Sequence, residues 1–198
     1  MIQDAPEYYE YNTRDTVVHY GLRSGQNQTA MLAMSILLDI IKPKNIIEFG
    51  TGTGGLSVLI GIWSKLNGAN FRTYDNNDQR LYAEIFNKLG IEFICCDVHA
   101  LHGDIIPHIQ QPGVSLVLCD DGNKHQELEE YAPHLKPYDY IMMHDYSRDL
   151  DAYNSRIKPK YWDWHESSEF AGTQLGLTPV YERLLEYAVW GCFRKEQG

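Results

Sequence analysis

The chain has 198 residues, of which 43% are hydrophobic and 22% are charged, and these proportions are typical of a folded globular domain. Its net charge of −10 argues against a broad nucleic-acid surface, which would need a basic stripe, and no apolar run approaches the roughly 20 residues of a membrane-spanning helix. Because residues 1–4 lack the basic and apolar start of a signal peptide, we expect a cytoplasmic protein that contacts neither nucleic acid nor membrane.

The predicted elements alternate after a polar, tyrosine-rich arm at residues 1–28. A helix is expected over Thr29–Ile41, with Thr29 as its N-cap and Lys42-Pro43 at its end. Strands are then expected at five apolar runs: Ile46–Phe49, Phe71–Tyr74, Glu92–Cys96, Val114–Cys119 and Tyr140–Met143. Helices are expected between them at Leu56–Leu66, Asp78–Leu89, Leu101–Ile109 and His125–Leu135. This alternation predicts an α/β fold with a parallel sheet covered by helices on both faces.

Residues 148–198 are less regular, and we expect them to hold the substrate-side and closing elements. A helix is expected within Asp163–Leu177. Val180–Tyr187 and Ala188–Arg194 are expected to pair as antiparallel strands, although the stretch PVYERLLEYAV also scans as one helix. No linker separates the arm, a cofactor-binding core at 29–147 and this last segment, so residues 1–198 are predicted to form a single domain.

The stretch NIIEFGTGTGGLSVLI, residues 45–60, places four glycines between a predicted strand and a predicted helix. Such a turn commonly cradles part of a nucleotide, because glycine lets the backbone come close to a bound group. Gly50, Gly52 and Gly55 match the dinucleotide pattern G-x-G-x-x-G, which leaves a nicotinamide-dependent oxidoreductase open. Glu48 inside the strand, and a full helix before that strand, favour an adenosyl ligand instead.

Acidic residues stand at the end of every predicted strand: Glu48, Asp75, Asp97, Asp120 with Asp121, and Asp145. Because ligands bind beyond the carboxyl ends of parallel strands, we expect these acids to converge on one cleft. Asp75 follows Gly55 by 20 residues, a spacing at which a carboxylate can take the two hydroxyls of a ribose. Asp97 comes one strand-helix unit later and could reach an adenine amino group, and Asn76 could add a contact.

These residues resemble those of class I S-adenosylmethionine-dependent methyltransferases. IIEFGTGTGG resembles their first motif, acid-x-Gly-x-Gly-x-Gly, through Glu48, Gly50, Gly52 and Gly54. Asp75 resembles the ribose-binding acid of that superfamily and Asp97 its adenine-side acid. LVLCDDGNKH at 116–125 and HLKPYDYIMMHDY at 134–146 resemble the family 24 and cephalosporin-hydroxylase-like small-molecule O-methyltransferases.

The resemblance covers about residues 25–147 and implies a three-layer Rossmann-like fold, with a mostly parallel seven-stranded sheet and an antiparallel C-terminal strand. Two features depart from it. Lys136-Pro137 is followed by Tyr138-Asp139 rather than by a glycine pair, so the turn before the fifth strand should differ. Lys124 stands where a histidine is common, but catechol-type relatives have a catalytic lysine three residues after a metal-binding aspartate. That spacing makes Asp121 a better match than Asp120.

The resemblance implies methyl transfer from S-adenosylmethionine to a hydroxyl of a small molecule. The cofactor-binding residues that it implies are Glu48, Gly50, Thr51, Gly52, Gly54, Asp75, Asn76, Asp97, Val98 and Asp120. A divalent ion, Mg²⁺ or Mn²⁺, could bind neighbouring acceptor oxygens and lower a hydroxyl pKa, with Asp121, Asp145 and His144 as its ligands. A nitrogen ligand such as His144 suits Mn²⁺ or Fe²⁺ better than Mg²⁺. Lys124, His144 and Asp121 are the candidate catalytic residues, with Lys124 as a base.

Two other functions stay open besides the oxidoreductase. The chain could bind S-adenosylmethionine or a nucleoside without catalysis, because fold does not fix function. A nucleic-acid or protein methyltransferase fits the acidic charge less well. The expected partner is a small hydroxylated acceptor, and the assembly considered is a homodimer. Gly25-Gln26, just before the first predicted helix, lies where relatives often bring an N-terminal arm to the ligand.

Overall fold

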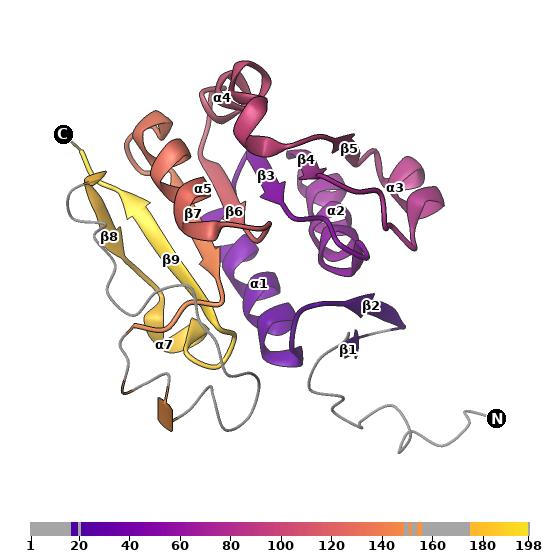
Figure 1. Cartoon of the computed structure of the whole chain (residues 1–198), viewed down its shortest axis with the longest axis horizontal. Helices are drawn as coiled ribbons and strands as arrows, with labels where there is room; N and C mark the ends of the chain where they lie inside the picture. Colours follow the sequence, from indigo (N-terminus) through magenta and orange to yellow (C-terminus); the bar gives the residue numbers. More distant parts are fainter. Residues whose placement is uncertain (1–16, 20, 149–150, 152–153, 156–174, 198) are drawn as a thin grey trace.

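The computed structural model describes residues 17–19, 21–148, 151, 154–155 and 175–197 (Figure 1). Its centre is a seven-stranded sheet with the strand order β5-β4-β3-β6-β7-β9-β8. These strands are β3 (Asn45–Phe49), β4 (Asn70–Asp75), β5 (Glu92–Cys95), β6 (Ser115–Cys119), β7 (Tyr140–His144), β8 (Leu177–Pro179) and β9 (Trp190–Lys195). β3 to β7 pair in parallel, whereas β9 runs antiparallel to both of its neighbours. The predicted mostly parallel sheet with an antiparallel C-terminal strand is confirmed.

Helices flank this sheet on both faces (Figure 1). They are α1 (Gln28–Ile41), α2 (Gly55–Asn67), α3 (Ala83–Leu89), α4 (His102–Ile109), α5 (Lys124–Tyr131) and α7 (Glu182–Leu185), with short 3-10 turns η2 (Val98–Ala100) and η3 (Ala132–His134). α1, α2, α3 and α7 supply one apolar core, and α4 and α5 supply the other. A separate two-stranded sheet, β1 (Val17–His19) with β2 (Leu22–Ser24), precedes α1.

β3 shows why the sheet needs two covered faces. All five of its residues are buried, and successive side chains point to opposite faces of the sheet. Ile46 therefore joins the core beside α1 and α2, while Ile47 and Phe49 join the core beside α4 and α5. Glu48 shares the face of Ile46, so its carboxyl group is directed toward α2. A strand buried on both faces reads as a nearly continuous apolar run, as this one does.

The order of the strands places an opening at the end of β3. The chain builds outward from β3 to β4 and β5, and then crosses to the other side of β3 to form β6 and β7. The loops that leave β3 and β6 therefore turn away to opposite faces, and ligands of open α/β sheets bind in the crevice between such loops.

Several predicted boundaries differ from the structure. The cap of α1 is Asn27 rather than Thr29, because the Asn27 side chain accepts the Ala30 N–H at 2.8 Å. α3 begins at Ala83, not at Asp78. Within the predicted arm, Val17–His19 (β1) and Leu22–Ser24 (β2) pair as antiparallel strands.

The predicted strand Val180–Tyr187 is wrong, and so is the single helix read from the same residues. β8 ends at Pro179, and Tyr181 has a left-handed φ of +59°, which turns the chain into the short helix α7. Val189 has a φ of +62° and marks the entry into β9. The helix expected within Asp163–Leu177 falls almost wholly outside the described residues.

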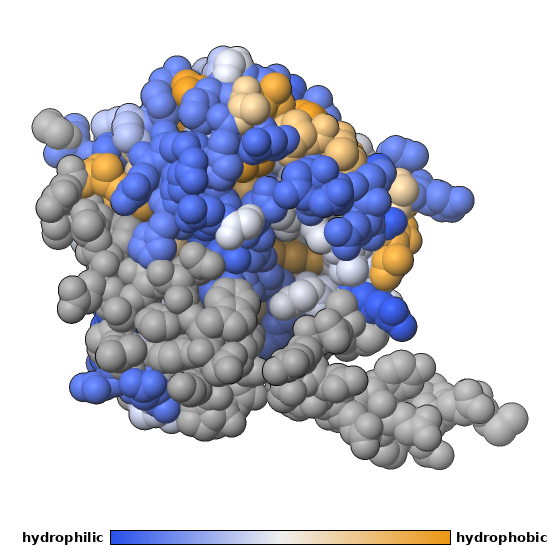
Figure 2. All heavy atoms as spheres, viewed as in Figure 1, coloured by the Kyte–Doolittle hydropathy of each residue, from blue (hydrophilic) through white to orange (hydrophobic). Residues whose placement is uncertain are grey.

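The described part of the face seen in Figure 2 is largely hydrophilic, in keeping with the net charge of −10. Among the helices of the described ranges, none combines the length and apolarity needed to cross a bilayer.

Candidate functional site

The glycine loop after β3 is held tightly between two other segments. Gly50 has a φ of +84°, and a Cβ on it would collide with the backbone carbonyl of Asp120 after β6. A Cβ on Gly55, the first residue of α2, would collide with the backbone carbonyl of Arg23 in β2. Glycine is therefore required at both positions, because the loop passes against main chain on either side.

Asp75 ties this loop to the end of β4. Its carboxylate is buried and accepts the Gly52 N–H at 2.8 Å through one oxygen and the Asn77 N–H at 2.9 Å through the other. The loop after β3 and the loop after β4 are thus fixed relative to each other by one charged group. Charge-assisted hydrogen bonds of this kind are stronger than neutral ones.

A cavity of about 400 Å³ opens between the glycine loop, the ends of β4 and β6, and the segment before α1. Nine of the predicted site residues line it: Glu48, Gly50, Thr51, Gly52, Asp75, Asn76, Asp120, Asp121 and His144. Its volume lies in the range of about 300–1,000 Å³ that is typical of small-molecule sites. Glu48 near the end of β3, Asp75 at the end of β4, and the two acids after β6 therefore do converge on one hollow.

Three other predicted cofactor residues do not line this cavity. Asp97 accepts the N–H of His99 at 2.9 Å and so caps the turn η2. The Val98 side chain is buried in the core beside α5, and the Val98 backbone carbonyl accepts a hydrogen bond from the Tyr131 hydroxyl. Gly54 is the N-cap of α2. A contact of these three residues with a cofactor stays a prediction.

Glu48 is an acid with almost no access to water. It is 1% exposed, and its carboxyl group accepts the Ser57 hydroxyl of α2 at 2.5 Å. Burial raises its pKa to about 8, because a desolvated carboxylate is disfavoured relative to the neutral acid. The wall of the cavity therefore carries a carboxyl group that is mostly uncharged at neutral pH.

A second cluster joins the ends of β6 and β7. One ligand atom each from Asp120, His144 and Asp145 can be chosen so that all three lie within 4.8 Å of one another. The His144 Nδ1 lies 2.7 Å from Asp120 Oδ1 and 3.4 Å from Asp145 Oδ1. Lys124, the first residue of α5, is buried and places its Nζ 3.1 Å from Asp145 Oδ2.

Burial and the neighbouring carboxylates act on His144 in opposite directions. Burial alone would lower the pKa of His144, but the carboxylates of Asp120 and Asp145 outweigh burial and raise that pKa above its usual value. Burial raises the pKa of Asp145, against the opposing effect of the His144 and Lys124 charges. The cluster therefore gathers two carboxylates, an imidazole and a lysine in a largely buried space.

The structure brings Asp120 into this cluster, not Asp121 as the sequence spacing suggested. Among the described residues, the group that could hold an ion is Asp120, His144 and Asp145. Asp121 instead lines the cavity, and burial raises the pKa of its carboxyl group. Its N–H donates to the buried Glu127 of α5 at 3.4 Å. The role of Asp121 as a ligand remains a prediction that this geometry does not favour.

The residues of the cluster fit a divalent cation. Two carboxylates and one imidazole offer both oxygen and nitrogen ligands, and their separation allows a single ion to reach all three. A mixed donor set of this type suits Mn²⁺ or Fe²⁺ better than Mg²⁺, which prefers oxygen ligands.

Gln26 and Trp190 touch this cluster, and sequence reasoning gave them little or no part in it. The Gln26 side chain donates to Asp120 Oδ2 at 2.6 Å and accepts the indole N–H of Trp190 at 2.7 Å. The Trp190 ring packs on the His144 imidazole with 4.8 Å between ring centroids. The sequence marked Gly25-Gln26 only by its place before α1, and nothing local marks Trp190, which comes from the far end of the chain.

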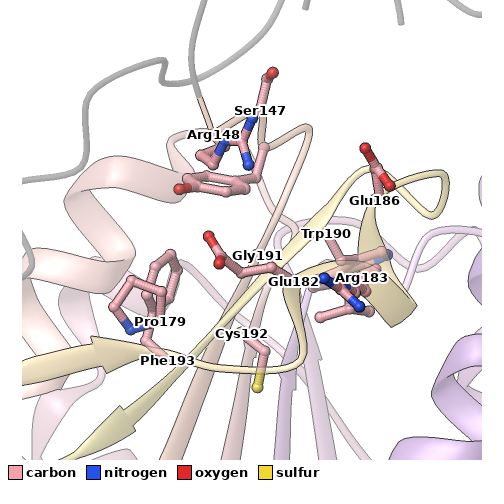
Figure 3. Close-up of a pocket in the computed structure, with 12 residues that line it drawn as sticks. Ser147, Arg148, Pro179, Glu182, Arg183, Glu186, Trp190, Gly191, Cys192 and Phe193 are labelled. Carbon is pink, nitrogen blue, oxygen red and sulfur yellow. The ribbon is translucent and has the colours of Figure 1, made fainter. Parts of the chain in front are cut away.

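A second cavity, also of about 400 Å³, is lined by the first residues of β9, including Trp190, and by α7 (Figure 3). Arg183 and Glu186 lie on one side of it, and Pro179 and Phe193 lie on the other (Figure 3). Ser147, two residues after Asp145, also lines it. Trp190 therefore separates this cavity from the imidazole of His144.

No protein-family model matches the chain, and no curated protein matches it in sequence. Solved structures match it in fold. An apo structure of CmcI has a TM-score of 0.66 and 17% identity over 91% of this chain and 76% of that chain. A CmcI structure with Mg and SAM has a TM-score of 0.64 and 18% identity over 90% and 76%. A putative caffeoyl-CoA O-methyltransferase from Staphylococcus aureus has a TM-score of 0.61 and 15% identity over 86% and 84%. At these identities the likeness shows a shared fold.

Proposed function

We propose that this chain, which has the class I S-adenosylmethionine-dependent methyltransferase fold, transfers a methyl group from S-adenosylmethionine to a hydroxyl of a small molecule. One observation carries the proposal. The cavity at the end of β3 has the glycine loop on one wall and reaches Asp120 and His144 of the candidate metal centre on another. A cofactor bound along the glycine loop would thus have its reactive end beside groups that can bind and deprotonate an acceptor.

The cofactor would be held chiefly by the elements that Asp75 ties together. Asp75 stands where an acid takes ribose hydroxyls, and it lies in the wall of the cavity beside Asn76. Glu48, on the same wall, becomes ionised most readily when a positive charge is placed near it, and the amino group and sulfonium of S-adenosylmethionine are both positive. The acidic lining therefore suits a cationic ligand better than a dinucleotide, whose phosphates are anionic.

Methyl transfer needs the acceptor oxygen in line with the methyl carbon and sulfur, and it needs the hydroxyl proton to be removed. A divalent ion bound by Asp120, His144 and Asp145 would supply acceptor binding and a lowered hydroxyl pKa. Lys124 is the base in this proposal, because burial of its Nζ favours the neutral amine, and that Nζ lies at the same centre, 3.1 Å from Asp145 Oδ2. Its paired carboxylate would hold the ammonium in place once the proton has been taken up.

The first experiment is calorimetry with S-adenosylhomocysteine. Asp75→Asn should weaken binding roughly 10-fold or more, because it removes the charge that a ribose hydroxyl meets. Asp39→Asn, on the exposed surface of α1, is the matched control and should bind as the wild type does. Absence of binding to the wild-type protein would refute the proposed cofactor.

The second experiment measures methyl transfer to catechols, other phenols and sugars, with Mn²⁺, with Mg²⁺ and with a chelator. Transfer that requires the ion and prefers Mn²⁺ supports the full proposal. Tight cofactor binding without transfer to any acceptor would favour a binding protein instead. Enhanced fluorescence of a reduced nicotinamide on mixing would favour an oxidoreductase.

A further inference from the structure

The amide of Gln26 connects two parts of the chain that are 164 residues apart in sequence. Its Oε1 accepts the Trp190 indole N–H at 2.7 Å, and its Nε2 donates to Asp120 Oδ2 at 2.6 Å. Gln26 is 4% exposed, so water has little access to either hydrogen bond. The result is a linear chain of hydrogen bonds that ends on a carboxylate of the candidate metal centre.

The chemistry of the three groups fixes the direction of this chain. An indole N–H can only donate, so it must meet the oxygen of the amide and not its nitrogen. The amide NH₂ is thereby turned toward Asp120, which as a carboxylate can only accept. With the amide flipped, the indole N–H would face the amide NH₂, and the amide oxygen would face the carboxylate. Trp190 therefore selects the orientation in which Gln26 donates to Asp120.

Gln26 is also held firmly at its backbone. Its own N–H donates to the Ser24 hydroxyl at 3.1 Å. The next residue, Asn27, caps α1 through the Ala30 N–H and donates its amide to the carbonyl of Tyr187 at 3.1 Å. The start of α1 is thus fastened to the segment that leads into β9. A side chain carried on such a fixed base can hold its partner in one geometry.

We infer that Gln26 is a positioning residue that fixes the Asp120 carboxylate for metal binding, and that Trp190 fixes Gln26 in turn. With Oδ2 of Asp120 engaged by the amide, Oδ1 is the oxygen directed at His144, 2.7 Å away. The Trp190 ring packs on the same imidazole, so one aromatic side chain supports two of the three candidate ligands. This inference rests on the metal centre of the proposed function. Groups that orient metal ligands commonly change metal affinity by roughly 10- to 100-fold when they are removed.

The test is a titration of the full-length protein with Mn²⁺, followed by the electron paramagnetic resonance signal of the free ion. Gln26→Met keeps the length of the side chain and removes both hydrogen bonds, and it should weaken Mn²⁺ binding roughly 10- to 100-fold. Gln28→Met, two residues later on α1, is the matched control and should bind Mn²⁺ as the wild type does. Trp190→Phe keeps an aromatic ring on His144 but removes the N–H donor, so it should also weaken binding, by less than Gln26→Met does.

The double variant tests whether the two residues act through one chain. Since Trp190 is inferred to act through Gln26, Gln26→Met with Trp190→Phe should lose no more affinity than Gln26→Met alone. Additive losses would overturn the inference, and so would wild-type affinity in Gln26→Met. Should Gln26→Met fail to fold, wild-type affinity in Trp190→Phe would overturn it, and weakened binding would support it.

The outcome can be separated from that of the proposed function. If the wild-type protein binds no Mn²⁺, the metal part of the proposed function is wrong, and crystal structures of the wild type and Gln26→Met then decide the positioning role. An Asp120 carboxylate that keeps its orientation in Gln26→Met would overturn that role, and one that has rotated away from His144 would support it.

Discussion

The buried carboxyl group of Glu48 predicts a pH-dependent stability that one substitution should remove. Glu48→Gln replaces the acid with an amide of the same size, which can still accept the Ser57 hydroxyl. The substitution should therefore leave packing unchanged and abolish only the titration. Because the native carboxyl group is 1% exposed, the change isolates the cost of ionising an acid inside the cavity wall.

The size and sign of the effect follow from the two pKa values. The pKa rises from 4.5 when unfolded to about 8 in the folded protein, so the unfolded state loses its proton first as the pH increases. Stability from the protonated acid is thus fully present below pH 4.5 and is lost progressively up to about pH 8. At about 1.4 kcal/mol per pKa unit, the gap between wild type and Glu48→Gln should widen by roughly 2–3 kcal/mol between pH 6 and pH 9.

Urea unfolding at several pH values measures this gap directly. Glu48→Gln should become progressively more stable than the wild type as the pH rises, even though Glu127, whose burial also raises its pKa to about 8, titrates in both proteins. Glu129→Gln, on the exposed face of α5, is the control and should show no such trend. Parallel stability curves for wild type and Glu48→Gln would mean that the folded protein holds this carboxylate ionised, and the reasoning from burial would be refuted.

Three further predictions concern other residues. In urea unfolding, Gly50→Ala should lower the free energy of unfolding far more than Gly52→Ala, because a Cβ at Gly50 collides with the backbone of Asp120. A Cβ at Gly52 meets no neighbour, and only the φ of +52° disfavours alanine there, by about 1–2 kcal/mol. Equal losses in the two variants would contradict the collision. Lys124→Met should lower the rate of methyl transfer by roughly 100-fold or more, while the affinity for S-adenosylhomocysteine in calorimetry stays unchanged. Lys88→Met, at an exposed position of α3, is the control. A wild-type rate in Lys124→Met would show that Lys124 is not the base. Asp139→Asn should lower the free energy of unfolding in urea by roughly 2–3 kcal/mol, because the buried carboxylate accepts hydrogen bonds from the Ser115 N–H, the Lys136 N–H and the Lys136 ammonium. Wild-type stability in this variant would show that an amide can replace these hydrogen bonds.

The turn that contains Asp139 shows how a departure from a motif can be absorbed. The sequence has Tyr138-Asp139 where the O-methyltransferase motif that it resembles has a glycine pair, and a different turn was expected there. Tyr138 adopts a φ of +71°, a conformation that glycine takes more readily, and it is half exposed. The hydrogen bonds to Asp139 hold the turn closed despite that conformation. The local sequence indicated that the turn would differ, but it could not predict the side-chain hydrogen bonds that stabilise the turn.

The sequence determined the order of the elements and the character of the sheet. Five apolar runs between helical stretches predicted β3 to β7 to within a residue or two at each end. The central strands β3, β6 and β7 are buried almost throughout, and such strands read as nearly continuous apolar runs. The glycine loop could also be predicted from the sequence, because a left-handed backbone conformation and close contact with neighbouring main chain leave few alternatives to glycine. Glu48 and Asp75 could be assigned to one cleft because parallel strands end at a common edge.

Only the tertiary structure decided which side chains meet at the end of β6. Asp120 and Asp121 are neighbours in sequence, and a spacing rule favoured Asp121. Successive residues leave a strand in different directions, however, so Asp120 joins His144 and Asp145, while Asp121 lines the cavity beside the glycine loop. The contacts of Gln26 and Trp190 were beyond any local pattern, because they join the beginning of α1 to the last strand. Local sequence dictates backbone conformation and burial through steric and hydrophobic constraints, whereas contacts between distant segments depend on how the completed sheet brings those segments together.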